Sequence, residues 1–99
     1  MEKFPHSYRV SATAPPGDDP TTISTPDLPD LEGHSPPEFD GPAGYWSPET
    51  MLLGAVANCL VLTWRSVARV NKFEWTDLTV DVHGVLDRID RVTRFTKVD

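Results

Sequence analysis

Apolar residues are spread unevenly along the chain, and one run of them dominates the pattern. Between Met51 and Trp64 nearly every side chain is apolar, on all sides of a helical wheel. Ser47 is a favourable N-cap, and Pro48 suits the first helical position, where no backbone N–H is needed. The pattern predicts a long central helix over residues 47–70. A helix that is apolar on every side is expected to be buried on every side.

The surroundings of this helix are predicted to be protein rather than lipid. We expect the apolar run to be too short for a bilayer span, and Arg65 and Arg69 close it. Complete burial of such a helix is a large demand on a chain of 99 residues, because small domains bury a modest fraction of their surface. We therefore expect a second subunit to supply part of the cover, as in a homodimer.

Short strands and a long loop are predicted before the helix. Residues 6–25 contain two β-rich runs on either side of a turn rich in Pro, Gly and Asp, which indicates two short strands. Residues 26–46 are too rich in proline for a helix or a central strand. Widely spaced apolar residues, ending on Tyr45 and Trp46, favour an ordered loop that lies against the helix, and not a disordered segment.

A β-hairpin is predicted after the helix, over residues 77–98. Apolar and polar residues alternate from Leu78 to Leu86, which is typical of a half-buried strand, and Val92–Val98 has a second strand pattern. The order of elements predicts a single domain over residues 1–99. Its fold class is α+β, with strands of an antiparallel sheet packed on the buried central helix. Because the strand pattern is still open at Asp99, we expect the domain to be incomplete at its C-terminus.

Charge and cysteine content narrow the function classes. The formal net charge is −6, whereas proteins that bind nucleic acid or anionic membranes need a basic surface. The first residues lack the apolar core of a signal peptide, and one cysteine cannot form an intrachain disulfide, so we expect a cytoplasmic protein. The histidines His6, His34 and His83 lie far apart, and no spacing predicts a metal site or a cofactor.

Cys59 is the first candidate for chemistry. A free cysteine usually packs as a small apolar residue, and the helix pattern alone favours that interpretation. A reactive thiol needs a nearby cation or donor that stabilises the thiolate. Cys59 lies roughly three turns from the start of the helix, where the helix dipole contributes little. A catalytic role would therefore require a basic residue from elsewhere in the protein.

Glu49 and Arg9 are the candidates for residues that would assist the thiol. Glu49 is either a solvated carboxylate of the first turn or a group that orients an arginine. Ten residues of helix place it about 15 Å from Cys59 along the axis and about 80° around it, so the two side chains cannot meet within one helix. A shared site would need a second helix, most simply from a second copy of the chain. Arg9 lies on the predicted first strand, where a surface charge is the commoner role.

The segment 46–59 resembles the central helix of the OsmC/Ohr family. The Pro48-Glu49 pair, the step of ten residues to Cys59 and the small residues between them carry the resemblance. It implies an OsmC-like fold, an intertwined homodimer and a thiol-dependent peroxidase that reduces organic hydroperoxides in oxidative-stress defence, with active sites at the subunit interface. Cys59 takes the place of the cysteine that attacks the peroxide. Glu49 takes the place of the carboxylate that positions the catalytic arginine.

Two departures from the family pattern shape the expectation. The family's arginine stands in a Gly-Arg context that this sequence lacks, which leaves Arg9 as a stand-in. The family's second helix and second cysteine have no counterpart in this sequence, so we expect an external thiol reductant and an activity impaired by the missing part. The rival interpretations are a non-catalytic dimerisation module with Cys59 as packing, and a binder of small apolar ligands with a wall of Tyr45, Trp46 and Trp64.

Overall fold

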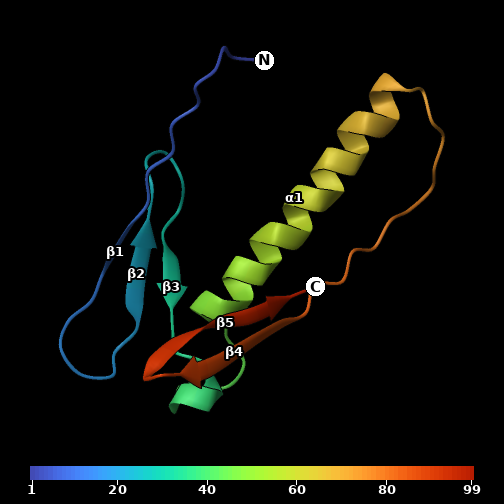
Figure 1. The fold of residues 1–99 in the computed structure, drawn as a ribbon. Coiled ribbons are helices and arrows are strands. Elements are labelled where there is room, and N and C mark those ends of the chain that lie inside the picture. The colour runs from blue at the N-terminus through green and yellow to red at the C-terminus, as the bar shows by residue number, and fades with distance from the viewer. The chain divides into compact units, whose positions relative to one another are not determined.

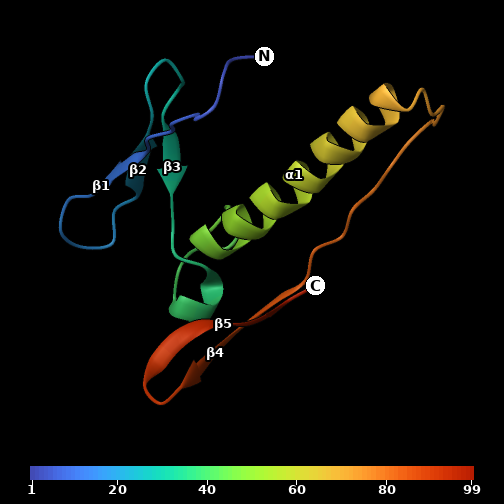
Figure 2. The same ribbon diagram turned by 45° about the horizontal axis from the view of Figure 1, so that its top comes forward.

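The computed structural model describes residues 1–99 and divides them into two compact units, Met1–Pro48 and Glu49–Asp99. Each unit is described by itself. The elements in chain order are β1 Ser11–Thr13, β2 Thr21–Ser24, β3 Leu31–Gly33, the 3-10 helix η1 Pro37–Phe39, α1 Pro48–Val70, β4 Gly84–Ile89 and β5 Val92–Val98 (Figure 1 and Figure 2). One long helix and two small antiparallel sheets confirm the predicted α+β class.

The N-terminal unit is built on a three-stranded sheet of order β1-β2-β3. Both strand pairs are antiparallel, with Ala12 opposite Ile23 and Ile23 opposite Leu31. Strand β3 lies inside the stretch 26–46 that was predicted to be a loop. The proline argument excluded only helices and central strands, and β3 is a three-residue edge strand without proline. The proline content of residues 26–46 therefore did not exclude a short edge strand without proline.

Strand β3 leads into the short helix η1, which ends in a tight turn. Asp40 adopts a left-handed conformation with φ of 62°, and its N–H donates to the carbonyl of Pro37 at 3.0 Å. The N–H of Gly41 donates to the carbonyl of Pro36, also at 3.0 Å. A Cβ on Gly41 would collide with the carbonyl of Ser35, so glycine is required for this turn.

The C-terminal unit begins with α1, a helix of 23 residues. Glu49 lies in its first turn and Arg69 in its last, as the helix dipole favours. At its end, the N–H of Lys72 donates to the carbonyl of Arg69 at 3.2 Å and the N–H of Phe73 donates to that of Ala68 at 2.8 Å. Lys72 has a left-handed φ of 52°. This bonding pattern satisfies two of the orphan carbonyls at the helix end and terminates α1.

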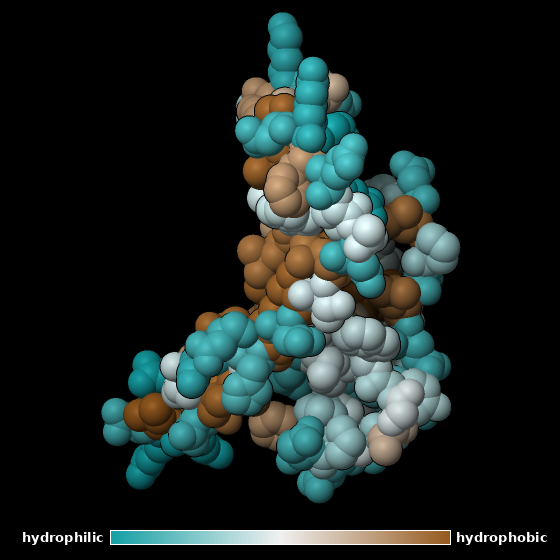
Figure 3. Space-filling model, turned by 90° about the vertical axis from the view of Figure 1, so that its right-hand side faces the viewer, coloured by the Kyte–Doolittle hydropathy of each residue, from teal (hydrophilic) through white to brown (hydrophobic).

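The expectation that α1 is buried on every side is wrong for the single chain. Ala68 is its only buried residue, and the exposed fraction of Leu60 is 51%. Hydrophobic side chains gather on the surface drawn in Figure 3. Apart from Ala68, the side chains of α1 are half-buried or exposed within the single chain. The helix thus has more apolar surface than the single chain buries.

The expectation that α1 is too short for a bilayer span is also wrong. By length and composition, α1 is long and apolar enough to cross a membrane. The strongly apolar run alone is shorter than α1, because the helix continues through the turns on either side of that run.

The hairpin after the helix is shorter at its start than predicted. Strand β4 begins at Gly84 instead of Leu78, and it pairs with β5 through a bulge between Val85 and Leu86. The residues 78–82 still alternate between half-buried and exposed, but no strand is hydrogen-bonded to them. Alternation reports burial on one face, whereas a strand also needs a hydrogen-bonded neighbour. The turn uses Asp90 and Arg91, both with positive φ.

Two apolar contacts shape the C-terminal unit. A Cβ on Gly84 would lie 2.9 Å from Cδ1 of Leu53 in α1 and 3.0 Å from Cε1 of Phe95 in β5. Glycine therefore permits the close approach of the hairpin to the first half of the helix. Towards the other end of α1, the ring of Trp64 makes edge-to-face contacts with Phe73, at 5.6 Å between centroids, and Trp75, at 6.3 Å.

Candidate functional site

Cys59 lies in the middle of α1, with its thiol free and its side chain exposed. Within the single chain, the Cys59 side chain is therefore not part of a core. A thiol on the surface of the unit is accessible to a small oxidant. Exposure alone does not activate it, since reactivity depends on the fraction of thiolate.

The neighbours of Cys59 on the same helix face are apolar or neutral. The positions three residues away are Val56 and Leu62, with exposed fractions of 37% and 48%. The positions four residues away are Ala55 and Thr63. No charged side chain occupies any of these four positions. The helix itself therefore supplies no cation to the thiol, as the sequence predicted.

Glu49 carries an unusual oxygen. Its Oε1 atom is buried and has no hydrogen-bond partner, although the side chain as a whole is half-buried. A buried carboxylate oxygen without a donor costs free energy, of the order of 1–3 kcal/mol for an unsatisfied group. A guanidinium or another donor that reached this oxygen would remove that cost. Glu49 is therefore an acceptor that lacks its donor in the single chain.

Glu49 and Cys59 lie on one unbroken helix. Because α1 runs continuously from Pro48 to Val70, the separation of about 15 Å along the axis that the spacing predicts still applies. The structure brings both residues onto the same element and keeps their side chains apart. A single copy of α1 cannot place the carboxylate beside the thiol.

Arg9 belongs to the other unit and precedes the first strand. The sequence placed Arg9 on that strand, but β1 begins at Ser11. The Arg9 side chain is exposed, and its backbone carbonyl accepts a hydrogen bond of 2.6 Å from the hydroxyl of Thr25. Together with Tyr8 it lines a shallow hollow of about 380 Å³. The irregular backbone before β1 explains the difference, because strand pairing starts only where β2 provides partners.

The other arginines are also exposed and make no ion pair. The ion pairs of the chain join His34 to Glu32 and Lys97 to Asp99. Five arginines follow the start of the helix, namely Arg65, Arg69, Arg88, Arg91 and Arg94. A guanidinium without a carboxylate partner is free to serve a second molecule. No cluster of three or more metal-ligating side chains is present.

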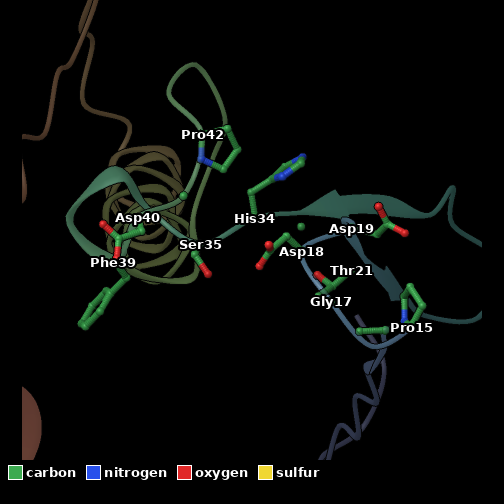
Figure 4. Close-up of a pocket in the computed structure, with 13 residues that line it drawn as sticks. Pro15, Gly17, Asp18, Asp19, Thr21, His34, Ser35, Phe39, Asp40 and Pro42 are labelled. Carbon is green, nitrogen blue, oxygen red and sulfur yellow. The ribbon is translucent and has the colours of Figure 1, made fainter.

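The sequence analysis missed a cavity in the N-terminal unit. It has a volume of about 570 Å³ and is lined by residues from the β1–β2 turn, the end of β3 and the turn after η1 (Figure 4). Its chemical groups include Asp18, Asp19, Asp40 and His34. These residues are scattered along the sequence, and no motif signals that the fold gathers them at one cavity.

Comparisons with known proteins identify the class to which this fold and helix belong. The family model described as OsmC-like protein matches residues 41–99, which include α1, Cys59 and the hairpin. The chain therefore belongs to the OsmC-like family, as the resemblance of segment 46–59 indicated.

One curated relative is the uncharacterized protein YmaD of Bacillus subtilis (strain 168), which is 32% identical over 63 residues. The match covers 64% of this chain and 42% of the relative. The matched part of the chain therefore spans less than half the length of that protein.

Proposed function

We propose that this protein is a thiol-dependent peroxidase that reduces organic hydroperoxides through Cys59. The observation that carries the proposal is an exposed thiol on a continuous helix, ten residues after the Pro48-Glu49 pair, in an OsmC-like domain. The apolar residues Val56 and Leu62 beside the thiol favour an apolar substrate over hydrogen peroxide. The activity would serve defence against oxidative stress in the cytoplasm.

The proposed reaction begins at the thiolate of Cys59. The sulfur attacks the terminal oxygen of the hydroperoxide, the O–O bond breaks, and the departing alkoxide takes up a proton to leave as an alcohol. Cys59 becomes a sulfenic acid. The chain has no second cysteine, so two equivalents of an external thiol reduce the sulfenic acid to the thiol, with formation of a disulfide and water.

Glu49 acts in this proposal as the residue that positions an arginine. Its buried and unpartnered Oε1 atom supports the role, because a guanidinium would satisfy the oxygen and then direct its charge at the thiolate. Arg9 is the proposed arginine. Since Glu49 and Cys59 are about 15 Å apart on one helix, the Glu49 that serves a given Cys59 would come from the second chain of a homodimer.

A second candidate function is a non-catalytic OsmC-like module for dimerisation or for small apolar ligands. The exposed apolar side chains of α1 favour it, since they offer a surface to either occupant. The aromatic wall predicted from sequence comprises residues of both units. Trp64 packs with Phe73 and Trp75, whereas Tyr45 and Trp46 belong to the N-terminal unit.

The two candidates differ in the chemistry of the thiol. The protein is exposed briefly to one equivalent of tert-butyl hydroperoxide, the remaining thiol is trapped by alkylation, and the intact mass is measured. The peroxidase hypothesis expects rapid loss of the trappable thiol and a sulfenic-acid or mixed-disulfide mass. Cys59→Ser is the matched control and should show neither. A thiol that reacts no faster than free cysteine in the folded protein would refute the peroxidase hypothesis and favour the non-catalytic module.

A further inference from the structure

Three aromatic side chains meet where α1 ends. Trp64 lies on the helix, and Phe73 and Trp75 belong to the segment that follows it. The ring centroid of Trp64 lies 5.6 Å from that of Phe73 and 6.3 Å from that of Trp75, at interplanar angles of 73° and 71°. Phe73 and Trp75 make no ring contact with each other. Two separate rings therefore contact a third at steep angles, as edge-to-face pairs prefer.

Hydrogen bonds at the helix end fix the backbone that carries two of these rings. The N–H and the side-chain amide of Asn71 both donate to the carbonyl of Val67, at 3.0 and 2.9 Å. The N–H of Phe73 donates to the carbonyl of Ala68 at 2.8 Å. The chain is thus folded back on the last turn of α1. A site whose groups are positioned before a ligand arrives loses less conformational entropy on binding.

The two rings after the helix border an open hollow. It has a volume of about 490 Å³ and is lined by Phe73, Glu74, Trp75 and Thr76. The exposed fractions of Phe73 and Trp75 are 59% and 37%, so both side chains offer aromatic surface to a ligand. The lining carries one charged group, the carboxylate of Glu74. Lys72, the neighbouring cation in the sequence, is not among the lining residues.

Aromatic rings beside a carboxylate suit an organic cation. The face of an aromatic ring is negative, and it attracts a cation within about 6 Å of its centroid. The compact ammonium of a lysine is strongly hydrated, whereas a trimethylammonium group has no N–H and presents methyl groups to the rings. The formal net charge of −6 favours the approach of cations in general.

We propose that the hollow beside Phe73 and Trp75 binds the trimethylammonium group of a small organic cation. The two rings contact its methyl groups, and the carboxylate of Glu74 balances its charge. Trp64 does not line the hollow and acts by holding the two rings through its edge-to-face contacts. The site uses none of the residues of the proposed peroxidase, so the two proposals are independent of each other.

The test is a titration of the full chain with choline chloride at constant ionic strength, followed by the indole N–H signals in ¹H–¹⁵N NMR spectra. The signals of Trp64 and Trp75 should shift saturably, whereas that of Trp46, which belongs to the N-terminal unit, should not shift. The matched ligand is 3,3-dimethyl-1-butanol, which has the shape of choline without its charge. It should bind at least about fivefold more weakly, because two ring contacts and a carboxylate lose their cation.

Matched variants separate cation binding from adhesion to an apolar cluster. Trp75→Leu keeps an apolar side chain and should weaken choline binding about fivefold or more. Glu74→Gln removes one exposed charge and should weaken it about twofold or more. Trp46→Leu is the control and should bind choline as the wild type does, and the amide signals of the β4–β5 hairpin show that each variant is folded.

Three results would each overturn the proposal. The first is equal binding of choline and its neutral analogue, which an apolar cluster alone would give. The second is an unchanged affinity for choline in Glu74→Gln and in folded Trp75→Leu. The third is an equal shift of all three indole signals, which would indicate a general effect of the salt.

Discussion

Replacement of Gly84 by alanine tests how the hairpin packs on the helix. The added Cβ would lie 2.9 and 3.0 Å from the two methyl carbons of Leu53 and 3.0 Å from Cε1 of Phe95. Carbon atoms pack best at about 3.5–4.0 Å, so three contacts are too short by about half an ångström or more. Overpacking of this kind costs about 1–3 kcal/mol.

Two effects bring the expected cost of Gly84→Ala to the lower part of that range. The short contacts are with the ends of the Leu53 and Phe95 side chains, which can move. Alanine also restricts the unfolded chain and returns about 0.4–1 kcal/mol where the backbone tolerates it. Since φ of Gly84 is not positive, alanine adds no left-handed strain. We expect a net loss of about 1 kcal/mol in the free energy of unfolding.

A double-mutant cycle in urea provides the assay. Leu53→Ala removes both crowded methyl groups and should itself cost about 2 kcal/mol or less, because Leu53 is only half-buried. In the Leu53→Ala background, Gly84→Ala should cost less than in the wild type, because only the short contact with Phe95 remains, which gives a coupling energy of about 0.5–1 kcal/mol. An equal loss from Gly84→Ala in both backgrounds would refute the contact between the hairpin and the helix.

Two further predictions concern the ends of α1. Lys72→Gly should raise the free energy of unfolding by about 0.5–1 kcal/mol, because glycine adopts the φ of 52° without the strain of a side chain. Lys72→Ala keeps the Cβ and is the control. It should give no such gain in the same urea titration. Glu49→Gln should slow the oxidation of Cys59 by an organic hydroperoxide about tenfold or more, because an amide cannot pair with the arginine as a carboxylate does. Glu38→Gln, on η1, is the control. Equal oxidation rates for the wild type and both variants would remove Glu49 from the proposed site.

The local pattern of the sequence was sufficient to predict the regular elements that carry strong signals. The helix was predicted over residues 47–70 and extends over Pro48–Val70. Its capping residue, its proline and its long apolar run all favour one structure, which is the condition under which local rules work best. The alternation after the helix reported which side chains are half-buried, but it could not report where hydrogen-bonded pairing begins. Strand β4 therefore starts six residues later than the alternation does.

The candidate site divides into a part that local sequence reveals and a part that it does not. Cys59 and Glu49 stand out because a helix of known pitch fixes their separation. The cavity with Asp18, Asp40 and His34 could not be predicted, since its residues come from separate turns that only the fold brings together. The same limit applies to the arginine. Arg9 was chosen as the only arginine before the helix, and no local pattern connects Arg9 to Glu49.

Two properties of α1 are unsatisfied within one chain, and they support the same proposal. Its apolar side chains are largely exposed, with only Ala68 buried. Its Glu49 has a buried carboxylate oxygen without a donor. The first property requires apolar cover and the second requires a cation. A second copy of the chain can supply both, because it carries the same apolar helix and unpaired arginines. Removal of apolar area from water at about 25 cal/mol per Å² would then help to offset the desolvation of the charged pair.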